Sequence, residues 1–212
     1  MLVSESHQFL FVHVPRTGGT SMRQILTPYS TQGSKGRVNK LWSRLGLAPW
    51  NRRHFPVHTA LSQAEAQLPR QVFRDYFKFA FVRNPWERMA SHYQALTLDR
   101  GHPRHDKVRS LADFAEYLSY EANRGKAFQS LLVTEASGKL GLDFLGRFEN
   151  LAADFSDVCA RIGIDADLPY LNQANPNGYN WREMYNSSCQ ALVAKHWAQE
   201  IEMLGYAFDE FN

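Results

Sequence analysis

A short segment near the start of the chain has the composition of a turn that binds phosphate. It follows the apolar run Phe9–Val14 and reads Arg16, Thr17, Gly18, Gly19, Thr20 and Ser21. The glycines free the backbone, so that several N–H groups can point at one anion, and a helix that starts there adds the partial positive charge of its N-terminus. Arg16 supplies a full positive charge, and the three hydroxyl groups are further donors. The segment therefore predicts a cradle for one phosphate or sulfonate group.

This segment differs from the phosphate loop of nucleoside triphosphatases. That loop needs Gly-Lys-Ser/Thr, in which the lysine reaches the terminal phosphates and the hydroxyl group holds Mg²⁺. Here Gly19 is followed by Thr20, and the only basic residue of the segment, Arg16, precedes the glycines. Taken alone, the segment leaves a second interpretation open, an ordinary glycine-rich connection between a strand and a helix.

A second cluster of polar residues follows the apolar run Tyr76–Val82. Arg83 comes directly after this run, where ligands of open α/β sheets bind, and Ser91 lies eight residues on. Asn84-Pro85-Trp86-Glu87 is a strong helix start, and Arg88 can share a helix face with Ser91. We expect Arg83 and Ser91 to hold a second phosphate. The alternative is that Arg83 pairs with a carboxylate and Ser91 is an ordinary surface residue. Two cradles together indicate a nucleotide with phosphates at both ends of its ribose.

The elements around these clusters predict an α/β domain with a parallel sheet. A capping box over Ser62–Glu65 predicts the start of a helix that Pro69 ends. Further helices are expected from Pro85 to about Leu98, from Ser110 to about Glu121, over Leu151–Ile162, and from Trp181 to Leu204. Asp99 to Arg109 is expected to be a surface loop. The 212 residues fit a single domain, residues 1–212, in which residues 30–56 are a mobile basic loop or a small insertion.

Composition narrows the class of protein. Apolar residues make up 44% and aromatic residues 13%, enough for a sizeable core, and the net charge of +3 suits an anionic ligand but not a dedicated nucleic-acid binder. Cys159 and Cys189 form no metal-ligand cluster, so neither a zinc site nor a disulfide framework is expected. No signal peptide is recognised and no apolar run approaches ~18 residues, so we expect no membrane span and a cytoplasmic location. The oligomeric state is left open.

Four segments resemble a known enzyme family. Phe11–Ser21 resembles the 5′-phosphosulfate loop of the carbohydrate sulfotransferases related to heparan sulfate 2-O-sulfotransferase. Phe81–Tyr93 resembles the 3′-phosphate motif of that family, an arginine and a serine eight residues apart. Gly146–Leu151 and Leu204–Phe208 look like further landmarks, and the similarity runs over roughly residues 8 to 208.

This resemblance implies a P-loop-like three-layer fold with a central parallel β-sheet flanked by helices. It implies the donor PAPS (3′-phosphoadenosine-5′-phosphosulfate), the product PAP, an in-line transfer of the sulfuryl group to a hydroxyl acceptor expected to be a carbohydrate, and no catalytic metal. Arg16 stands where the family usually has lysine. Arginine keeps the positive charge and can grip sulfonate oxygens bidentately, but it is bulkier. The departure bears on the rate more than on the type of reaction.

His58 is the predicted general base, because imidazole titrates near neutrality and the resemblance places a catalytic histidine here. His13, in the first apolar run, is the weaker candidate and is expected to be a hydrogen-bonded core residue. Weaker predictions for acceptor binding fall on the basic stretch from Lys35 to Arg53 and on a late segment, and they comprise Trp42, Trp50, Arg52, Arg53, Asn172, Tyr179 and Tyr185.

Two other functions stay open. A nucleotide or small-molecule kinase with a degenerate P-loop would need a lysine in the first turn and an acid placed for Mg²⁺, and no aspartate ends either apolar run. A nucleotide- or glycan-binding module without turnover is favoured by one feature, Arg16 in place of lysine. Dependence on magnesium would reveal the kinase, and binding without transfer would reveal the module.

Overall fold

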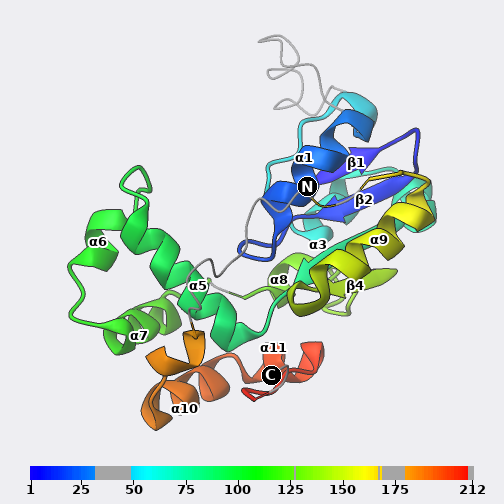
Figure 1. Ribbon diagram of the computed structural model, residues 1–212. Coiled ribbons are helices and arrows are strands. Elements are labelled where there is room, and N and C mark those ends of the chain that lie inside the picture. Colours follow the sequence, from blue (N-terminus) through cyan, green and yellow to red (C-terminus); the bar gives the residue numbers. More distant parts are fainter. Residues whose placement is uncertain (32–48, 127, 167, 169–179, 210–212) are drawn as a thin grey trace. The chain divides into compact units, whose positions relative to one another are not determined.

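The computed structural model describes residues 1–31, 49–126, 128–166, 168 and 180–209, and the chain divides into two compact units (Figure 1). Unit 1 comprises Met1–Val82 and Ser130–Asn172, and unit 2 comprises Arg83–Gln129 and Gln173–Asn212. Each unit has its own cluster of buried apolar side chains. No helix within the described residues has the length and apolar character needed to cross a membrane.

Unit 1 is built on a four-stranded sheet in the order β1-β2-β3-β4. The strands are β1 (Leu2–Ser4), β2 (Phe9–Val12), β3 (Phe77–Val82) and β4 (Phe144–Arg147). β2, β3 and β4 are parallel, whereas β1 is an antiparallel edge strand. The expected parallel sheet is therefore confirmed, although the sequence predicted only β2 and β3. β1 has only three residues, and β4 contains a glycine and an arginine, so neither forms a continuous apolar run.

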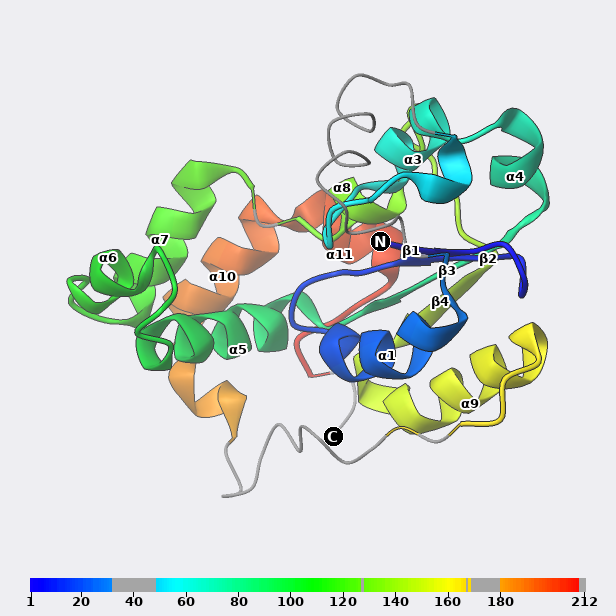
Figure 2. The same ribbon diagram turned by 90° about the horizontal axis from the view of Figure 1, so that it is seen from above.

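Helices cover both faces of this sheet (Figure 2). Four buried phenylalanines of β2 and β3 point to the side of α1 (Gly19–Leu26) and α9 (Leu151–Ile162), where they pack with Met22 and Phe155. The opposite face lies on the side of α3 (Leu61–Gln67), α4 (Arg70–Asp75) and α8 (Ser130–Val133). A sheet buried on both faces needs apolar side chains at successive positions, which explains the continuous apolar runs. The expected central sheet flanked by helices is confirmed.

Unit 2 is helical in its described part. It contains α5 (Pro85–Leu98), α6 (His105–Arg109), α7 (Phe114–Arg124), α10 (Ser187–His196) and α11 (Ala198–Leu204), together with the 3₁₀ turn η4 (Trp181–Met184). Its core is largely aromatic, with Trp86, Tyr117 and Trp197 among the buried side chains. Short 3₁₀ turns in unit 1 are η1 (Thr27–Tyr29), η2 (Trp50–Arg52) and η3 (Phe148–Asn150).

Several predicted helix ends are confirmed. α5 begins at Pro85 with Asn84 as N-cap, whose side-chain oxygen accepts the N–H of Trp86 at 3.1 Å. It ends at Leu98, where the sequence placed its end. α9 spans Leu151–Ile162 and ends at Gly163, which has the left-handed φ of 69° typical of a helix C-terminus.

Other predicted boundaries were wrong, each for a local reason. The expected loop at residues 99–109 contains α6, and the helix expected from Ser110 begins at Phe114, because Asp113 and not Ser110 accepts an N–H of its first turn. The expected helix at residues 181–204 is three pieces, since Asn186 caps a new start at Ser187 and Trp197 leaves the helical conformation.

The capping box was also misplaced. α3 starts after Ala60, whose N–H donates to the side-chain oxygen of Gln63 at 3.1 Å, two residues before the expected Ser62–Glu65 pair. Pro69 then serves as the N-cap of α4, so it begins a second short helix as well as ending the first.

Candidate active site

The first phosphate turn connects β2 to α1 and has two residues in the left-handed region. Gly18, the N-cap of α1, has φ 77°, and a Cβ built on it would lie 2.6 Å from Cδ2 of Leu151. Only glycine meets both conditions without strain. Arg16 has φ 69°, which is uncommon for a residue with a side chain. Its side chain is exposed. The turn thus presents the charged side chain of Arg16 to solvent, on a backbone conformation that costs free energy. Such strained residues cluster at functional sites.

Gly19 is required for a different reason, because the ring of His13 lies against it. A Cβ at Gly19 would be 2.1 Å from Cδ2 and 2.2 Å from Nε2 of His13, closer than atoms approach in proteins. The absence of a side chain at Gly19 therefore lets the helix start pack directly on this imidazole. The structure explains both glycines by packing, beyond the backbone freedom that the sequence suggested.

The three hydroxyl groups of the turn have different surroundings. Thr17 is buried, and its Oγ1 donates to the carbonyl oxygen of Val14 at 2.9 Å, which closes the turn from within. Ser21 is buried as well, whereas Thr20 is exposed. The first N–H groups of a helix lack intrahelical acceptors, so Thr20, Arg16 and the start of α1 offer donors suited to an anion.

His58 is held by the same histidine that lies against Gly19. Its Nδ1 lies 3.0 Å from the backbone carbonyl oxygen of His13, and the two rings are 4.9 Å apart between centroids. A carbonyl oxygen only accepts hydrogen bonds, so Nδ1 of His58 carries the proton. In the neutral imidazole this leaves Nε2 as a proton acceptor on an exposed side chain. The tautomer is the one that a general base needs.

His13 itself stays neutral. Its side chain is buried, and burial, together with the charges of His58 and Arg23, lowers its pKa from 6.5 to about 3. Its Nδ1 is buried and has no hydrogen-bond partner among the described residues. The expectation of a hydrogen-bonded core histidine is therefore half right: the ring is in the core, and the hydrogen bond is accepted by its backbone.

The second cluster stands at the start of unit 2, directly after β3. Nη2 of Arg83 donates to Oε1 of Glu87 at 2.7 Å, and both Arg83 and Ser91 are buried. The ion pair with a carboxylate, which the sequence left as an alternative, is present. The pair directs the guanidinium toward the first turn of α5, where Glu87 lies. Arg88 is also buried, with Nη2 3.6 Å from Oε1 of Glu200.

A model of the sulfotransferase family matches residues 1–207, nearly the whole chain. The chain belongs to the sulfotransferase family. The P-loop-like α/β architecture expected from the resemblance agrees with this family and with the observed sheet.

Individual relatives are distant. Carbohydrate sulfotransferase 11 of Rattus norvegicus is 22% identical over 100% of this chain and 66% of its own length. Carbohydrate sulfotransferase 14 of Danio rerio is 23% identical over 77% of this chain and 48% of its own length. An uncharacterized protein of Archaeoglobus fulgidus is 30% identical over 53% of this chain and 90% of its own length. The chain thus spans two thirds or less of the length of these sulfotransferases. No solved structure matches it significantly.

The family landmark over residues 146–151 has a packing role in unit 1. Gly146 pairs with Phe81 across the sheet, and a Cβ at Gly146 would lie 2.4 Å from the Phe81 ring. Leu151 then begins α9 and fills the space beside Gly18. This landmark therefore connects the core of the sheet to the first phosphate turn.

Sequence reasoning missed a buried polar network around the second cluster. Gln129 pairs with the backbone of Arg83, since its Oε1 accepts the Arg83 N–H at 2.9 Å and its Nε2 donates to the Arg83 carbonyl at 2.8 Å. The fully buried Glu200 accepts from Nε2 of Gln129 at 3.1 Å and from the Gln129 backbone N–H. No spacing could reveal this network, because Gln129 and Glu200 lie 71 residues apart.

The weaker acceptor predictions fall in several places. Trp50 lies in η2 with its ring edge-on to Tyr76, and Nη1 of Arg53 donates to the carbonyl oxygen of Gln67 at 3.0 Å. The Tyr185 hydroxyl donates to the carbonyl oxygen of Trp86 at 2.8 Å, inside the aromatic core of unit 2. Lys35, Trp42, Asn172, Tyr179 and the side chain of Arg52 lie outside the described part of the chain.

Proposed function

We propose that the chain transfers the sulfuryl group of PAPS to a hydroxyl group of a carbohydrate. The observation that carries the proposal is the His58–His13 hydrogen bond, which leaves Nε2 of His58 as a proton acceptor in a chain of the sulfotransferase family. The carbohydrate comes from the relatives, which are named carbohydrate sulfotransferases. The donor comes from the resemblance of the two clusters to its 5′ and 3′ motifs.

The donor would be held by charge and by oriented N–H groups. Arg16, Thr20 and the first N–H groups of α1 would bind the 5′-phosphosulfate, and their exposure and polarity fit an anionic group. Arg83 and Ser91 would bind the 3′-phosphate. The ion pair with Glu87 orients the Arg83 guanidinium, whose planar, charged group suits a phosphate.

The transfer step needs a base and stabilisation of negative charge. When bound, PAPS supplies a sulfuryl group on a phosphate leaving group. His58 Nε2 takes the proton of the attacking hydroxyl while a new sulfur–oxygen bond forms and the bond from sulfur to the 5′-phosphate oxygen breaks. The electron pair of that bond stays with PAP. Arg16 and the N–H groups at the start of α1 stabilise the charge on the sulfonyl oxygens and on the leaving phosphate.

The first experiment compares the thermal stability of the protein with PAP and with ADP, each with and without Mg²⁺. A ligand that binds only the folded state raises apparent stability by about 2.7 kcal/mol at a hundredfold excess over Kd. A shift with PAP that needs no metal, followed by transfer of label from radioactive PAPS to a panel of polysaccharides, is the expected result. Equal shifts with both nucleotides, or a shift that needs Mg²⁺, would favour a kinase and overturn the donor assignment.

Arg16 favours a second candidate, a binding module without turnover. Its bulkier, planar side chain sets it apart from the lysine that the resemblance expects at this position. PAP binding without label transfer to any polysaccharide would identify such a module. An Arg16→Lys variant that gains transfer would show that this residue alone limits turnover.

A further inference from the structure

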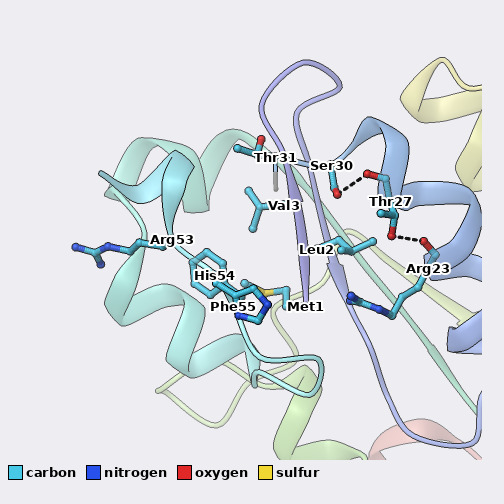
Figure 3. Close-up of a pocket in the computed structure, with 10 residues that line it drawn as sticks. All are labelled: Met1, Leu2, Val3, Arg23, Thr27, Ser30, Thr31, Arg53, His54 and Phe55. Carbon is cyan, nitrogen blue, oxygen red and sulfur yellow. Dashed lines mark hydrogen bonds between the residues drawn. The ribbon is translucent and has the colours of Figure 1, made fainter. Parts of the chain in front are cut away.

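A pocket of about 220 Å³ lies in unit 1, between β1, the C-terminal half of α1 and residues 53–55 (Figure 3). Arg23, Arg53 and His54 line it, as do the hydroxyl residues Thr27 and Ser30. No acidic side chain is among the described residues of its wall. Its lining is therefore basic and polar, and nothing in the family motifs assigns it a ligand.

Arg23 is the residue of this pocket best suited to bind a ligand. Its Nη1 atom is buried and has no hydrogen-bond partner in the part of the chain that the structure describes. Burial also lowers the pKa of its guanidinium, which nevertheless remains charged at neutral pH. Figure 3 shows this guanidinium extending toward Met1, whereas that of Arg53 points away from the other labelled residues. The residue as a whole is half-buried, but a buried N–H donor normally has a hydrogen-bond partner.

The pocket lies beside the proposed base. Met1 lines the pocket, and its N-terminal ammonium donates to the carbonyl oxygen of Pro56 at 2.7 Å, two residues before His58. The His13 ring in turn lies 4.9 Å from the ring of His58. A ligand group bound at Arg23 is thus a neighbour of the pair that sets the position of His58.

We propose that this pocket is an acceptor subsite that binds one anionic substituent, a carboxylate or a sulfate ester, with Arg23 as its cation. The inference rests on the proposed function, since it names the chemistry of the acceptor at the same site. A volume of about 220 Å³ is below the ~300–1,000 Å³ of pockets for drug-sized ligands, so it fits a single sugar residue or its charged group. The planar guanidinium binds carboxylate and sulfate oxygens bidentately.

Kinetics with matched acceptors test the subsite. The first acceptor is an oligosaccharide of alternating glucuronic acid and N-acetylglucosamine, and the second is the same oligosaccharide with its carboxylates reduced to alcohols. We expect the wild type to show a KM at least tenfold lower for the first, and Arg23→Gln to remove this difference while the KM for PAPS stays unchanged. A third acceptor, the reduced oligosaccharide carrying one sulfate ester, separates the two anions.

The controls address folding and charge. Arg23→Lys keeps the charge and should keep most of the preference, and Arg74→Gln, at an exposed residue of α4, should leave every KM within twofold. Thermal unfolding shows whether Arg23→Gln is folded. If Arg23→Gln raises the KM of the charged and the reduced acceptors equally, or changes neither, the inference is overturned.

A binding measurement separates this inference from the proposed function. Calorimetric titration of the glucuronic acid oligosaccharide needs neither PAPS nor turnover. If Arg23→Gln weakens its binding at least tenfold while no acceptor is ever sulfated, the anion subsite stands and the proposed function fails. If transfer occurs but the oligosaccharide binds both proteins equally, the proposed function stands and the subsite fails.

Discussion

The backbone carbonyl oxygen of His13 accepts a hydrogen bond from Nδ1 of His58 at 3.0 Å. The His13 ring meanwhile occupies the space where Gly19 would otherwise carry a side chain. One residue thus sets both the tautomer of the proposed base and the packing of the phosphate turn. His13 follows β2 directly, so the end of this strand positions both the His58 imidazole and the phosphate turn.

The first prediction concerns the proton-accepting atom of His58. His58→Ala is expected to lower kcat by ~10²–10⁴-fold, the usual contribution of a general base. PAP affinity should stay within twofold, because the imidazole serves the acceptor hydroxyl and not the nucleotide. Steady-state sulfotransfer and a calorimetric PAP titration measure the two effects.

His58→Asn is the matched control. Its side-chain amide can still donate to the His13 carbonyl, but it offers no basic nitrogen. Its kcat should fall as far as that of the alanine variant. Full activity in His58→Asn would assign the residue a positioning role and remove it as the base.

The second prediction concerns the 3′-phosphate. Arg83→Ala is expected to weaken PAP binding by roughly 10–100-fold, because hydrogen bonds to charged groups contribute about 1.5–3 kcal/mol. Binding of AMP, which has no 3′-phosphate, should change little. Isothermal titration of both nucleotides checks this, and an equal loss for PAP and AMP would mean that Arg83 acts only through its ion pair with Glu87.

The local signals in the sequence were sufficient for the parts of the fold that carry the two motifs. Apolar runs bounded by Pro15 and Arg83 predicted β2 and β3, and the Asn84–Pro85 start predicted α5 with both of its ends. These elements depend on contacts between neighbours in the chain, and such contacts leave a pattern. The glycine-rich turn between β2 and α1 was predicted from the same kind of local signal.

Features that depend on distant residues could not be predicted. The reason for Gly19 is the ring of His13, and one reason for Gly18 is Leu151, 133 positions later in the chain. The pairing of Gln129 with the Arg83 backbone likewise follows from the fold of unit 2 and from no motif. Short edge elements such as β1 are fixed by their partner strand and not by their own composition.

The third prediction separates backbone strain from packing at Gly18. Gly18→Ala and Gly138→Ala share a left-handed φ, 77° and 79°, but a Cβ at Gly138 meets nothing within 4 Å. Gly138→Ala should therefore lower the free energy of unfolding only by the cost of the left-handed conformation, roughly 1–2 kcal/mol. Gly18→Ala should lower the free energy of unfolding by about 1–3 kcal/mol more, because its Cβ would overpack against Leu151.

Urea unfolding of the two variants measures this difference. Adding Leu151→Ala to Gly18→Ala should recover part of the extra loss, because the two side chains would no longer compete for the same space. Equal losses in the two single variants would show that the Leu151 contact relaxes at no cost.

The fourth prediction concerns the buried carboxylate of Glu200. Glu200→Gln removes the charge opposite Arg88 and should lower the free energy of unfolding by about 3 kcal/mol, the lower end of the range for breaking a buried pair, since the two groups lie 3.6 Å apart. Asp75→Asn, which removes a charge from the exposed pair with Arg74, should cause no measurable change. Similar effects of both substitutions in urea unfolding would contradict a structural role for Glu200.

The last prediction follows from the lowered pKa of His13. The folded protein holds this imidazole neutral down to a pKa of about 3, whereas the unfolded chain binds the proton near pH 6.5. Between these values the unfolded state carries more protons, so stability falls as the pH drops from 6.5 toward 3, by at most ~1.4 kcal/mol per pH unit. His13→Gln should lack this contribution, because its side chain does not titrate. Its unfolding free energy should therefore decline less steeply than that of the wild type below pH 6.5. Parallel curves in urea unfolding from pH 7.5 to 4 would show that the His13 imidazole is protonated in the folded protein.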